Sequence, residues 1–255
     1  MRQDATCGAK PEESHAQAER KHTMSKSPEH KATCPPLSLD AALGACPLVA
    51  ILRWITPQEV EDVTGLLIDA GFRMIEVPLN SPDAFNSIER ITARFGSQAI
   101  IGAGTVMSPH DVVRVRDAGG RLIVMPHADT AVISAAHAHE MSCIPGVATP
   151  TEGFAALQAG ADGLKIFPAE SISPAVLKAW RAVYASHIPL MPTGGITPET
   201  MAAWIEAGAS GFGIGGNLYR PGRSLEDIKA SATAFIGAWR NARFEDEGNA
   251  AKIAQ

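Results

Sequence analysis

Short apolar runs alternate with amphipathic segments between residues 47 and 240. Each run is almost entirely apolar, which is the pattern of parallel strands that are covered on both faces. The pattern predicts strands at 49–53, 73–77, 98–102, 121–125, 141–145, 163–167, 188–192 and 211–215. The segments between these runs predict helices, among them 57–70, 108–118, 130–139, 151–159, 174–184 and 198–207.

The ends of the predicted helices carry capping signals. A hydroxyl residue followed by proline is typical of a helix start, because the hydroxyl caps the first turn and proline fits at its first position. This pair occurs at Thr56-Pro57, Ser108-Pro109, Ser173-Pro174 and Thr197-Pro198. Glycine is typical just beyond a helix end. Glycines occupy such places at Gly71, Gly119, Gly160 and Gly208.

Eight predicted strands at near-even spacing favour an α/β protein with a TIM (β/α)8 barrel in a single domain. An open flavodoxin-like or Rossmann sheet is the alternative, although no Gly-x-Gly-x-x-Gly follows the first predicted strand. We assign the barrel to residues 41–242. Residues 1–40 are expected to form a disordered leader, because they contain little apolar surface to bury, and residues 243–255 a C-terminal tail.

Composition limits the partners and the compartment. The 255 residues have a formal net charge of −5, which argues against nucleic acid as a partner, since phosphate backbones are bound by excess Lys and Arg. No run reaches the ~18 apolar residues of a membrane span, and the N-terminus lacks the apolar core of a secretory signal. The four cysteines show no Cys-x-x-Cys spacing, so neither a disulfide framework nor a metal site is predicted. We expect a cytoplasmic protein.

Lys165 carries the strongest chemical signal. It interrupts the apolar run Gly-Leu-Lys-Ile-Phe-Pro, whereas Lys178 and Lys229, the other lysines between residues 47 and 240, fall on polar helix faces. Burial disfavours the charged ammonium and lowers its pKa, and a neutral amine beside a carbonyl substrate forms a Schiff base. The alternative is a lysine that extends from a strand end into solvent.

Two further charged residues lie at predicted strand ends, where the catalytic groups of a barrel are found. Glu76, in Met-Ile-Glu-Val-Pro, is a candidate for proton transfer. Arg53 ends the first predicted strand, and its planar guanidinium suits a substrate carboxylate or phosphate. A buried salt bridge between the two, or pairing of Arg53 with a neighbouring loop, is the structural alternative.

Glycine pairs follow the last two predicted strands, at Gly194-Gly195 and Gly215-Gly216. Glycine lets backbone N–H groups approach an oxyanion, and barrels often bind phosphate with these two loops. The pairs therefore predict a phosphate site. In the loop Gly-Ala-Gly-Thr-Val, Thr105 is a candidate contact for a substrate carboxylate.

These motifs resemble the 2-keto-3-deoxy-6-phosphogluconate and 2-keto-3-deoxy-6-phosphogalactonate aldolases over residues 47–242. The resemblance includes Ile-Glu-Val-Pro-Leu-Asn-Ser-Pro, Ile-Gly-Ala-Gly-Thr-Val, Leu-Lys-Ile-Phe-Pro-Ala-Glu and Thr-Gly-Gly-Ile-Thr-Pro-Glu, in this order. It implies a class I aldolase without metal or other cofactor, normally a homotrimer, whose substrate is a phosphorylated 2-keto-3-deoxy sugar acid. The products would be pyruvate and D-glyceraldehyde 3-phosphate.

The resemblance also implies roles for individual residues. Lys165 would be the Schiff-base lysine and Glu76 the acid and base, while Arg53 and Thr105 would contact the substrate. The phosphate would be bound by residues Gly194, Gly195, Gly215 and Gly216.

The two substrates of these aldolases are epimers at C4. The segments 79–82 and 218–222 resemble the phosphogalactonate branch, whereas Thr193 resembles the phosphogluconate branch, in which the threonine can hydrogen-bond the substrate. Gly216-Asn217 stands where the family often has a serine hydroxyl for the phosphate. We expect phosphogalactonate, because two loops support it and one residue opposes it. Phosphogluconate, or both epimers, is the alternative.

Two other function classes remain as hypotheses. A phosphosugar isomerase or epimerase on the same barrel would need a pair of bases or metal ligands at the strand ends, and histidine is absent from most of them. A non-catalytic phosphosugar-binding protein would keep the glycine loops but would not need Lys165.

Overall fold

The structure is a computed structural model that describes the backbone of residues 37–253 and the side chains of residues 37–242. The predicted leader, as far as residue 36, lies outside the described residues. The described chain begins at α1 (Leu39–Ala45), a helix that the hydrophobic pattern did not predict. Ser38 caps this helix, since its side chain accepts a hydrogen bond from the Ala41 N–H at 3.2 Å.

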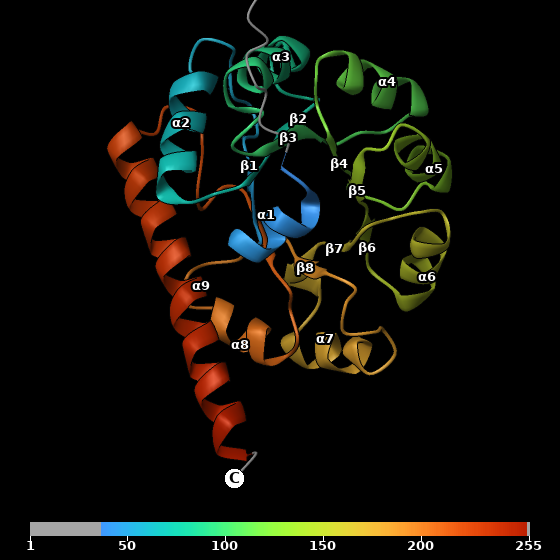
Figure 1. Ribbon diagram of the computed structural model, residues 1–255, viewed down its shortest axis with the longest axis vertical. Coiled ribbons are helices and arrows are strands. Elements are labelled where there is room, and N and C mark those ends of the chain that lie inside the picture. The colour runs from blue at the N-terminus through green and yellow to red at the C-terminus, as the bar shows by residue number, and fades with distance from the viewer. Residues whose placement is uncertain (1–36, 254–255) are drawn as a thin grey trace, which may run out of the picture. The chain divides into compact units, whose positions relative to one another are not determined.

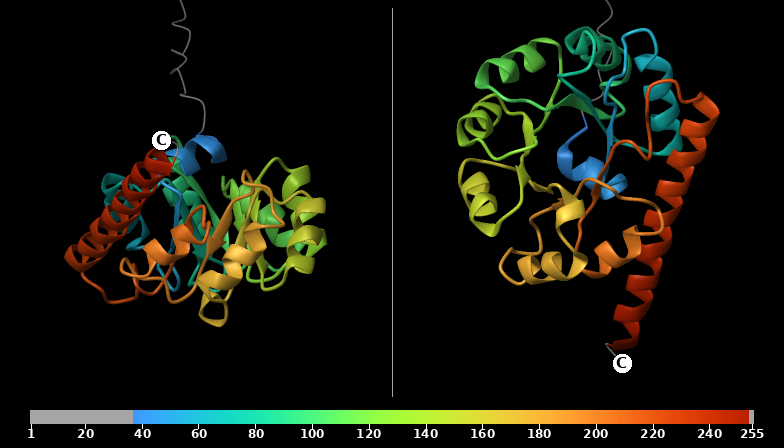
Figure 2. Two further views of the ribbon diagram at one scale, coloured as in Figure 1. Left: turned by 90° about the horizontal axis from the view of Figure 1, so that it is seen from below. Right: turned by 180° about the vertical axis from the view of Figure 1, so that it is seen from behind.

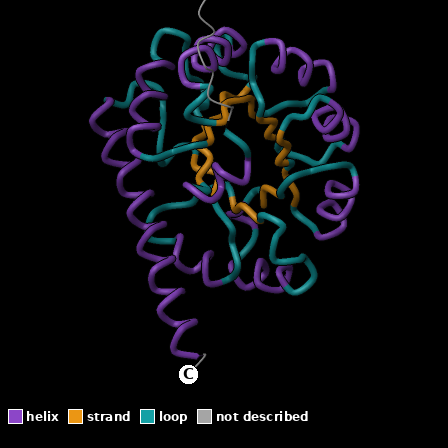
Figure 3. The backbone as a smooth tube through the Cα atoms, in the orientation of Figure 1, coloured by secondary structure: helices purple, strands orange, loops and turns teal. Residues whose placement is uncertain are grey.

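The strands of the described region pair in parallel and form two sheets. The six-stranded sheet has the order β5-β4-β3-β2-β1-β9, and the three-stranded sheet has the order β6-β7-β8. The bounds are β1 (Leu48–Ile51), β2 (Met74–Pro78), β3 (Ile100–Gly104), β4 (Leu122–Val124), β5 (Ser142–Ile144), β6 (Gly146–Val147), β7 (Leu164–Ile166), β8 (Leu190–Pro192) and β9 (Phe212–Ile214). An isolated parallel bridge between Thr193 and Gly213 lies just beyond β8 and within β9. Figure 3 shows the strands curled around a common centre, with helices outside them.

The prediction of an α/β fold built on parallel strands is confirmed, and every predicted strand interval overlaps a strand of the structure. In the fifth predicted interval, 141–145, β5 ends before Pro145, and the separate strand β6 begins directly after it. Proline has no N–H to donate to a ladder. Before it β5 pairs with β4, and after it β6 pairs with β7, so the chain changes partner at this residue. The result is a curled parallel sheet in two parts.

Helices cover the outside of the strands (Figures 1 and 2). Their bounds are α2 (Val60–Ala70), α3 (Ala84–Phe95), α4 (Pro109–Asp117), α5 (Thr130–Ala138), α6 (Pro150–Gln158), α7 (Pro174–Arg181), α8 (Met201–Glu206) and α9 (Leu225–Ile253), with a short 3-10 helix, η1 (Ala169–Ser171), after β7. All six predicted helices are present. The predicted tail, residues 243–255, continues the backbone of α9 as far as Ile253, and its side chains lie outside the described residues.

The capping signals were partly correct. Ser108 and Ser173 cap α4 and α7, each accepting a hydrogen bond from the backbone N–H three residues later. The prediction was wrong for the other two pairs, because α2 and α8 begin one turn later than expected. The backbone N–H of Thr56 donates to Glu59 Oε1, and that of Thr197 to Thr200 Oγ1, so both threonines belong to turns that precede the helices. The four predicted terminal glycines all have positive φ angles, from 83° at Gly119 to 119° at Gly71.

Side chains from the strands pack on two sides. Alternate strand residues such as Leu164, Ile166, Ile75 and Val77 belong to the larger core between strands and helices. A smaller core inside the strands packs against Ala42 of α1, and it contains Val49, Met74, Ile100, Leu122, Val124, Ile144 and Met191. Arg121, at the start of β4, donates a hydrogen bond to the Leu37 carbonyl at 2.9 Å. Helix α1 therefore covers the N-terminal ends of the strands.

The described helices include none that is both long enough and apolar enough to cross a lipid bilayer.

Candidate active site

The alternation of strand residues directs Lys165 and Glu76 to the interior. Lys165 lies between Leu164 and Ile166, and Glu76 lies between two residues of the same outer core. Because successive side chains of a strand point to opposite faces, both charged groups point inward. Lys165 is 6% exposed and Glu76 is 1% exposed. The strands thus bring an amine and a carboxyl into the same buried space.

Burial changes the acidity of both groups. Desolvation raises the pKa of Glu76 to about 7, although the positive charges of Lys165 and Arg53 oppose the rise. Desolvation also lowers the pKa of Lys165, with a contribution from Arg53, although the negative charge of Glu76 opposes the fall. The two shifts bring the pKa values of the two groups toward each other, which lowers the cost of passing a proton between them.

Gly104 makes room for the carboxyl of Glu76. A Cβ atom built on Gly104 would overlap the Glu76 carboxyl group, whose Oε1 would lie 2.7 Å away. Within the described part of the chain, Glu76 Oε2 is buried and has no hydrogen-bond partner. An unpaired buried oxygen is costly, so this atom is available to a water or to a substrate.

Arg53, Asn80 and Thr105 meet at the mouth formed by the loops after β1, β2 and β3. Arg53 Nη1 donates to Asn80 Oδ1 at 3.1 Å, and it lies 3.5 Å from Thr105 Oγ1. Thr105 has a φ of 56°, in the left-handed region that side chains other than glycine rarely adopt. The guanidinium is therefore aimed by two neutral oxygens rather than by a salt bridge. Arg53 remains free to bind an anion.

An open pocket of about 320 Å³ lies above these residues. It brings together Arg53, Lys165, Thr193 and both glycine pairs, as the strand-end pattern predicted. Glu76 instead lines a smaller cavity of about 10 Å³, which it shares with Lys165 and Thr193. Lys165 and Thr193 line both spaces, whereas the predicted residue Thr105 lines neither and reaches the site only through Arg53.

Thr193 is 5% exposed, and its hydroxyl donates a hydrogen bond to the Met191 carbonyl at 3.2 Å. The hydroxyl lies so close to Gly213 that a Cβ atom there would collide with it. Thr193, which resembles the phosphogluconate branch, thus donates its hydroxyl proton to its own segment and keeps an acceptor oxygen at the pocket.

The glycine loops lie side by side at the pocket rim. Gly194 and Gly195 both have positive φ, 112° and 63°. Asn217, which follows the second glycine pair, donates from Nδ2 to the Ile196 carbonyl at 2.8 Å. This bond connects the loop after β9 to the loop after β8. Backbone N–H groups from both loops therefore lie at one rim, as binding of a phosphate by two loops requires.

Strand-end reasoning missed two residues that line the pocket. Phe167 places its ring beneath the amine, with Lys165 Nζ 4.9 Å from the ring centroid. Glu170 lies in η1 and faces the first glycine pair. Both residues come just after the strand that carries Lys165. This position in the sequence was the only signal that could have indicated a place at the site.

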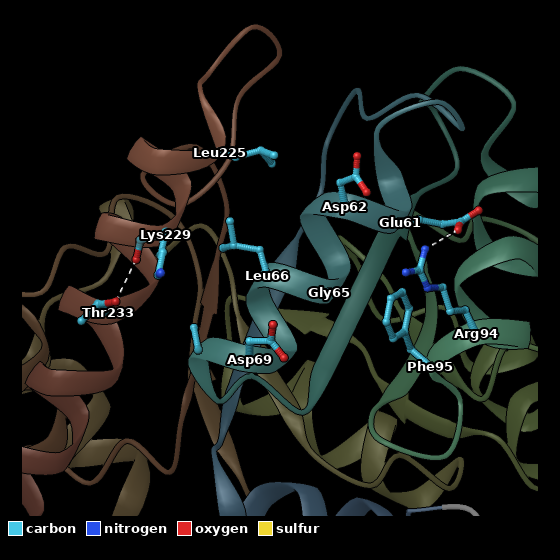
Figure 4. A pocket seen from close by; sticks show the side chains of 11 residues that line it. Glu61, Asp62, Gly65, Leu66, Asp69, Arg94, Phe95, Leu225, Lys229 and Thr233 are labelled. Atoms are coloured by element: carbon cyan, nitrogen blue, oxygen red, sulfur yellow. Dashed lines mark hydrogen bonds and ion pairs between the residues drawn. The ribbon is translucent and has the colours of Figure 1, made fainter.

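A larger hollow of about 830 Å³ lies elsewhere, on the outer surface between α2, α3 and α9 (Figure 4). Glu61 at this surface is paired with Arg90 and Arg94 at 2.7 and 2.8 Å. The lining includes neither Lys165 nor any other predicted site residue. Among the described residues, no group of three or more His, Cys, Asp or Glu side chains is arranged to hold a metal ion.

Comparison with known proteins identifies the family of the chain. The "KDPG and KHG aldolase" family model matches residues 39–231. The 2-dehydro-3-deoxy-6-phosphogalactonate aldolase of Escherichia coli strain K12 is 47% identical over 196 residues, which cover 77% of this chain and 96% of that protein.

Two solved structures resemble the chain. A native KDPGal structure is 47% identical with a TM-score of 0.76, and the match covers 77% of this chain and 95% of the other. A cube-shaped, highly porous protein cage, designed by fusing symmetric oligomeric domains, is 45% identical with a TM-score of 0.81. That match covers 82% of this chain and 77% of the cage chain. The chain belongs to the KDPG and KHG aldolase family.

Proposed function

We propose that the chain is a class I aldolase that cleaves 2-dehydro-3-deoxy-6-phospho-D-galactonate into pyruvate and D-glyceraldehyde 3-phosphate. The observation that carries the proposal is the pairing of a buried amine, Lys165, with a buried carboxyl, Glu76, under an open pocket. The identity of 47% to a relative named as a phosphogalactonate aldolase supports this epimer. The hydrogen bond from Thr193 to the Met191 carbonyl uses the proton of the hydroxyl, so this side chain can offer the substrate only an acceptor oxygen.

The reaction begins when the neutral Lys165 amine attacks the C2 ketone, and loss of water leaves an iminium. Glu76, acting through a water, removes the proton of the C4 hydroxyl. The C3–C4 bonding electrons then move onto the iminium and leave an enamine, while C4 departs as an aldehyde. Protonation of the enamine at C3 and hydrolysis of the imine release pyruvate and regenerate the amine.

The rim residues orient the substrate. Arg53, aligned by Asn80 and Thr105, binds the C1 carboxylate. The turns at Gly194-Gly195 and Gly215-Gly216 bind the phosphate through backbone N–H groups. No serine hydroxyl is present beside the second pair, where Asn217 instead stabilises the loop. The pocket thus carries anion sites for both ends of the substrate.

The fold that supports this site is a closed eight-stranded (β/α)8 barrel. In this proposal β5 and β6 act as one strand interrupted at Pro145, and the bridge from Thr193 to Gly213 closes the ring between β8 and β9. A homotrimer in the cytoplasm completes the proposal, supported by the similarity to a chain designed from symmetric oligomeric domains. Sedimentation velocity on the full chain tests the trimer, and a single monomeric boundary would contradict it.

The catalytic proposal is tested by incubating the protein with pyruvate and sodium borohydride, then mapping the adduct by mass spectrometry. We expect one reduced adduct, on the peptide that contains Lys165. An active enzyme without this adduct would contradict the mechanism. Initial rates on the two C4-epimeric phosphates test the substrate. Equal rates would show dual specificity, and phosphate binding without cleavage of either epimer would favour a non-catalytic binding protein.

A further inference from the structure

The carboxylate of Glu170 lies on the glycine turn that we assign to the phosphate. A Cβ atom built on Gly194 would lie 2.8 Å from Glu170 Cδ and 2.9 Å from its Oε1. A Cβ atom built on Gly195 would lie 3.0 Å from Glu170 Cγ. The acidic side chain therefore fills the space directly over both glycines. An acidic side chain thus lies within a few ångström of the turn that we assign to the phosphate.

The backbone of Glu170 is fixed beside this turn. The Ala169 N–H donates to the Thr193 carbonyl at 2.9 Å, and the Ser171 N–H donates to the Pro168 carbonyl at 3.0 Å. The first of these bonds joins η1 directly to the end of β8, next to Gly194. The position of the Glu170 backbone is thus set by the main chain on both sides of it.

The carboxylate itself is not held. Among the described residues it accepts no hydrogen bond and forms no ion pair, and the residue is exposed. An exposed group without partners leaves its position at little cost. Glu170 is therefore placed at the turn by its backbone but can move away from it by side-chain rotation alone.

A phosphate and this carboxylate exclude one another. Two like charges a few ångström apart repel. A phosphate monoester carries close to two negative charges at neutral pH, so it cannot lie on Gly194 and Gly195 while the carboxylate remains there. Either the side chain leaves or the phosphate does.

We propose that Glu170 is a specificity-determining residue that competes with the phosphate for the Gly194-Gly195 turn. The inference rests on the proposed function and extends it. Substrate binding displaces the carboxylate. After the C3–C4 bond breaks, the aldehyde product is no longer attached to Lys165 and is retained by its phosphate end. Return of the carboxylate to the turn then expels that product.

The test is the affinity for inorganic phosphate, measured by isothermal titration calorimetry on the full chain. Glu170→Gln keeps the shape of the side chain and removes its charge. We expect the variant to bind phosphate roughly three- to tenfold more tightly, as expected for loss of one like charge near the surface. Glu199→Gln is the matched control, because Glu199 is exposed, follows the same strand as the glycine turn and does not line the pocket. Its affinity should equal that of the parent protein.

A second variant separates charge from contact. Glu170→Asp keeps the charge but shortens the side chain by one methylene, which withdraws the carboxylate from Gly195. We expect an affinity for phosphate between those of the parent and Glu170→Gln. In steady-state assays, Glu170→Gln should lower the KM of the phosphorylated substrate and leave that of the unphosphorylated sugar acid unchanged. It should also strengthen inhibition by D-glyceraldehyde 3-phosphate.

Unchanged or weaker phosphate binding in Glu170→Gln would overturn the inference. Borohydride trapping of pyruvate on Lys165, measured on the same preparations, distinguishes this result from failure of the proposed function. Trapping without a change in phosphate affinity would refute only the role of Glu170. Tighter phosphate binding without trapping would refute the aldolase mechanism and leave the competition at the turn intact.

Discussion

Lys165 and Glu76 line the same small cavity from strands of different sheets, β7 and β2. The cavity has a volume of about 10 Å³. This is on the order of the space that one water molecule needs, and the unpaired Glu76 Oε2 offers such a water a partner. The pair can therefore exchange protons through a single water in this small cavity.

Replacing the amine removes the reaction and leaves the fold. Lys165→Met keeps a long unbranched side chain without a charge, so the buried site is not strained. We expect cleavage to fall to background and the borohydride adduct to disappear, while the circular dichroism spectrum stays unchanged. Lys178→Met is the control, because Lys178 is exposed on α7, and it should retain full activity. Residual cleavage by Lys165→Met above one part in a thousand would argue against Schiff-base catalysis.

The pH profile reports the carboxyl of Glu76. Burial raises its pKa to about 7, so the base form that removes the C4 hydroxyl proton is the minor form below this pH. We expect kcat/KM to rise roughly tenfold between pH 6 and pH 8. Glu76→Gln should lower kcat by about 10²- to 10⁴-fold and abolish this rise. A parent profile that is flat from pH 6 to 8 would show that Glu76 is not the base.

A methyl group at position 104 should disturb the site. Gly104→Ala would place a Cβ atom in the space of the Glu76 carboxyl, and we expect a loss of about 1–3 kcal/mol in the free energy of unfolding together with a large loss of kcat. Gly44→Ala is the control, because nothing lies within 4 Å of a Cβ atom there and the residue is in a helix. Urea denaturation should show the control to be as stable as the parent or more stable.

Arg53 should act on the carboxylate end of the substrate only. Arg53→Ala removes the charged donor, and we expect the pyruvate concentration for half-maximal borohydride trapping to rise roughly 10- to 100-fold. The affinity for inorganic phosphate should stay within twofold of the parent, since the glycine turns are unchanged. A loss of phosphate affinity with no change in pyruvate trapping would reverse the assignment of the two anion sites.

Lys165 and Glu76 could be predicted because each of them interrupts an apolar run, a signal that is contained within a few residues. Arg53 and the glycine pairs could be predicted from a second rule, since the carboxyl ends of parallel strands lie on one side of the sheet.

The residues beyond the strands could not be predicted in this way. Glu170 faces the Gly194-Gly195 turn only because a backbone bond from Ala169 to Thr193 ties η1 to β8, and this contact joins segments far apart in the sequence. Helix α3 was missed because Asp83, before its first turn, has a φ of 44° and provides no side-chain capping bond. Helices α2 and α8 begin later than predicted because a turn precedes each of them, and a hydroxyl-proline pair alone does not distinguish such a turn from a helix start.

The interruption at Pro145 has a consequence for how tolerant the chain is of length changes. The Pro145 carbonyl accepts the backbone N–H of Lys165 at 2.9 Å, so the residue between β5 and β6 also fixes the position of Lys165 along β7. Adding or deleting one residue in that segment would offer Lys165 a carbonyl about 3.3 Å higher or lower along the strand. Loops on the helical exterior are free of such a constraint. Here, a change in the number of residues before Lys165 would also change the depth of its amine in the site.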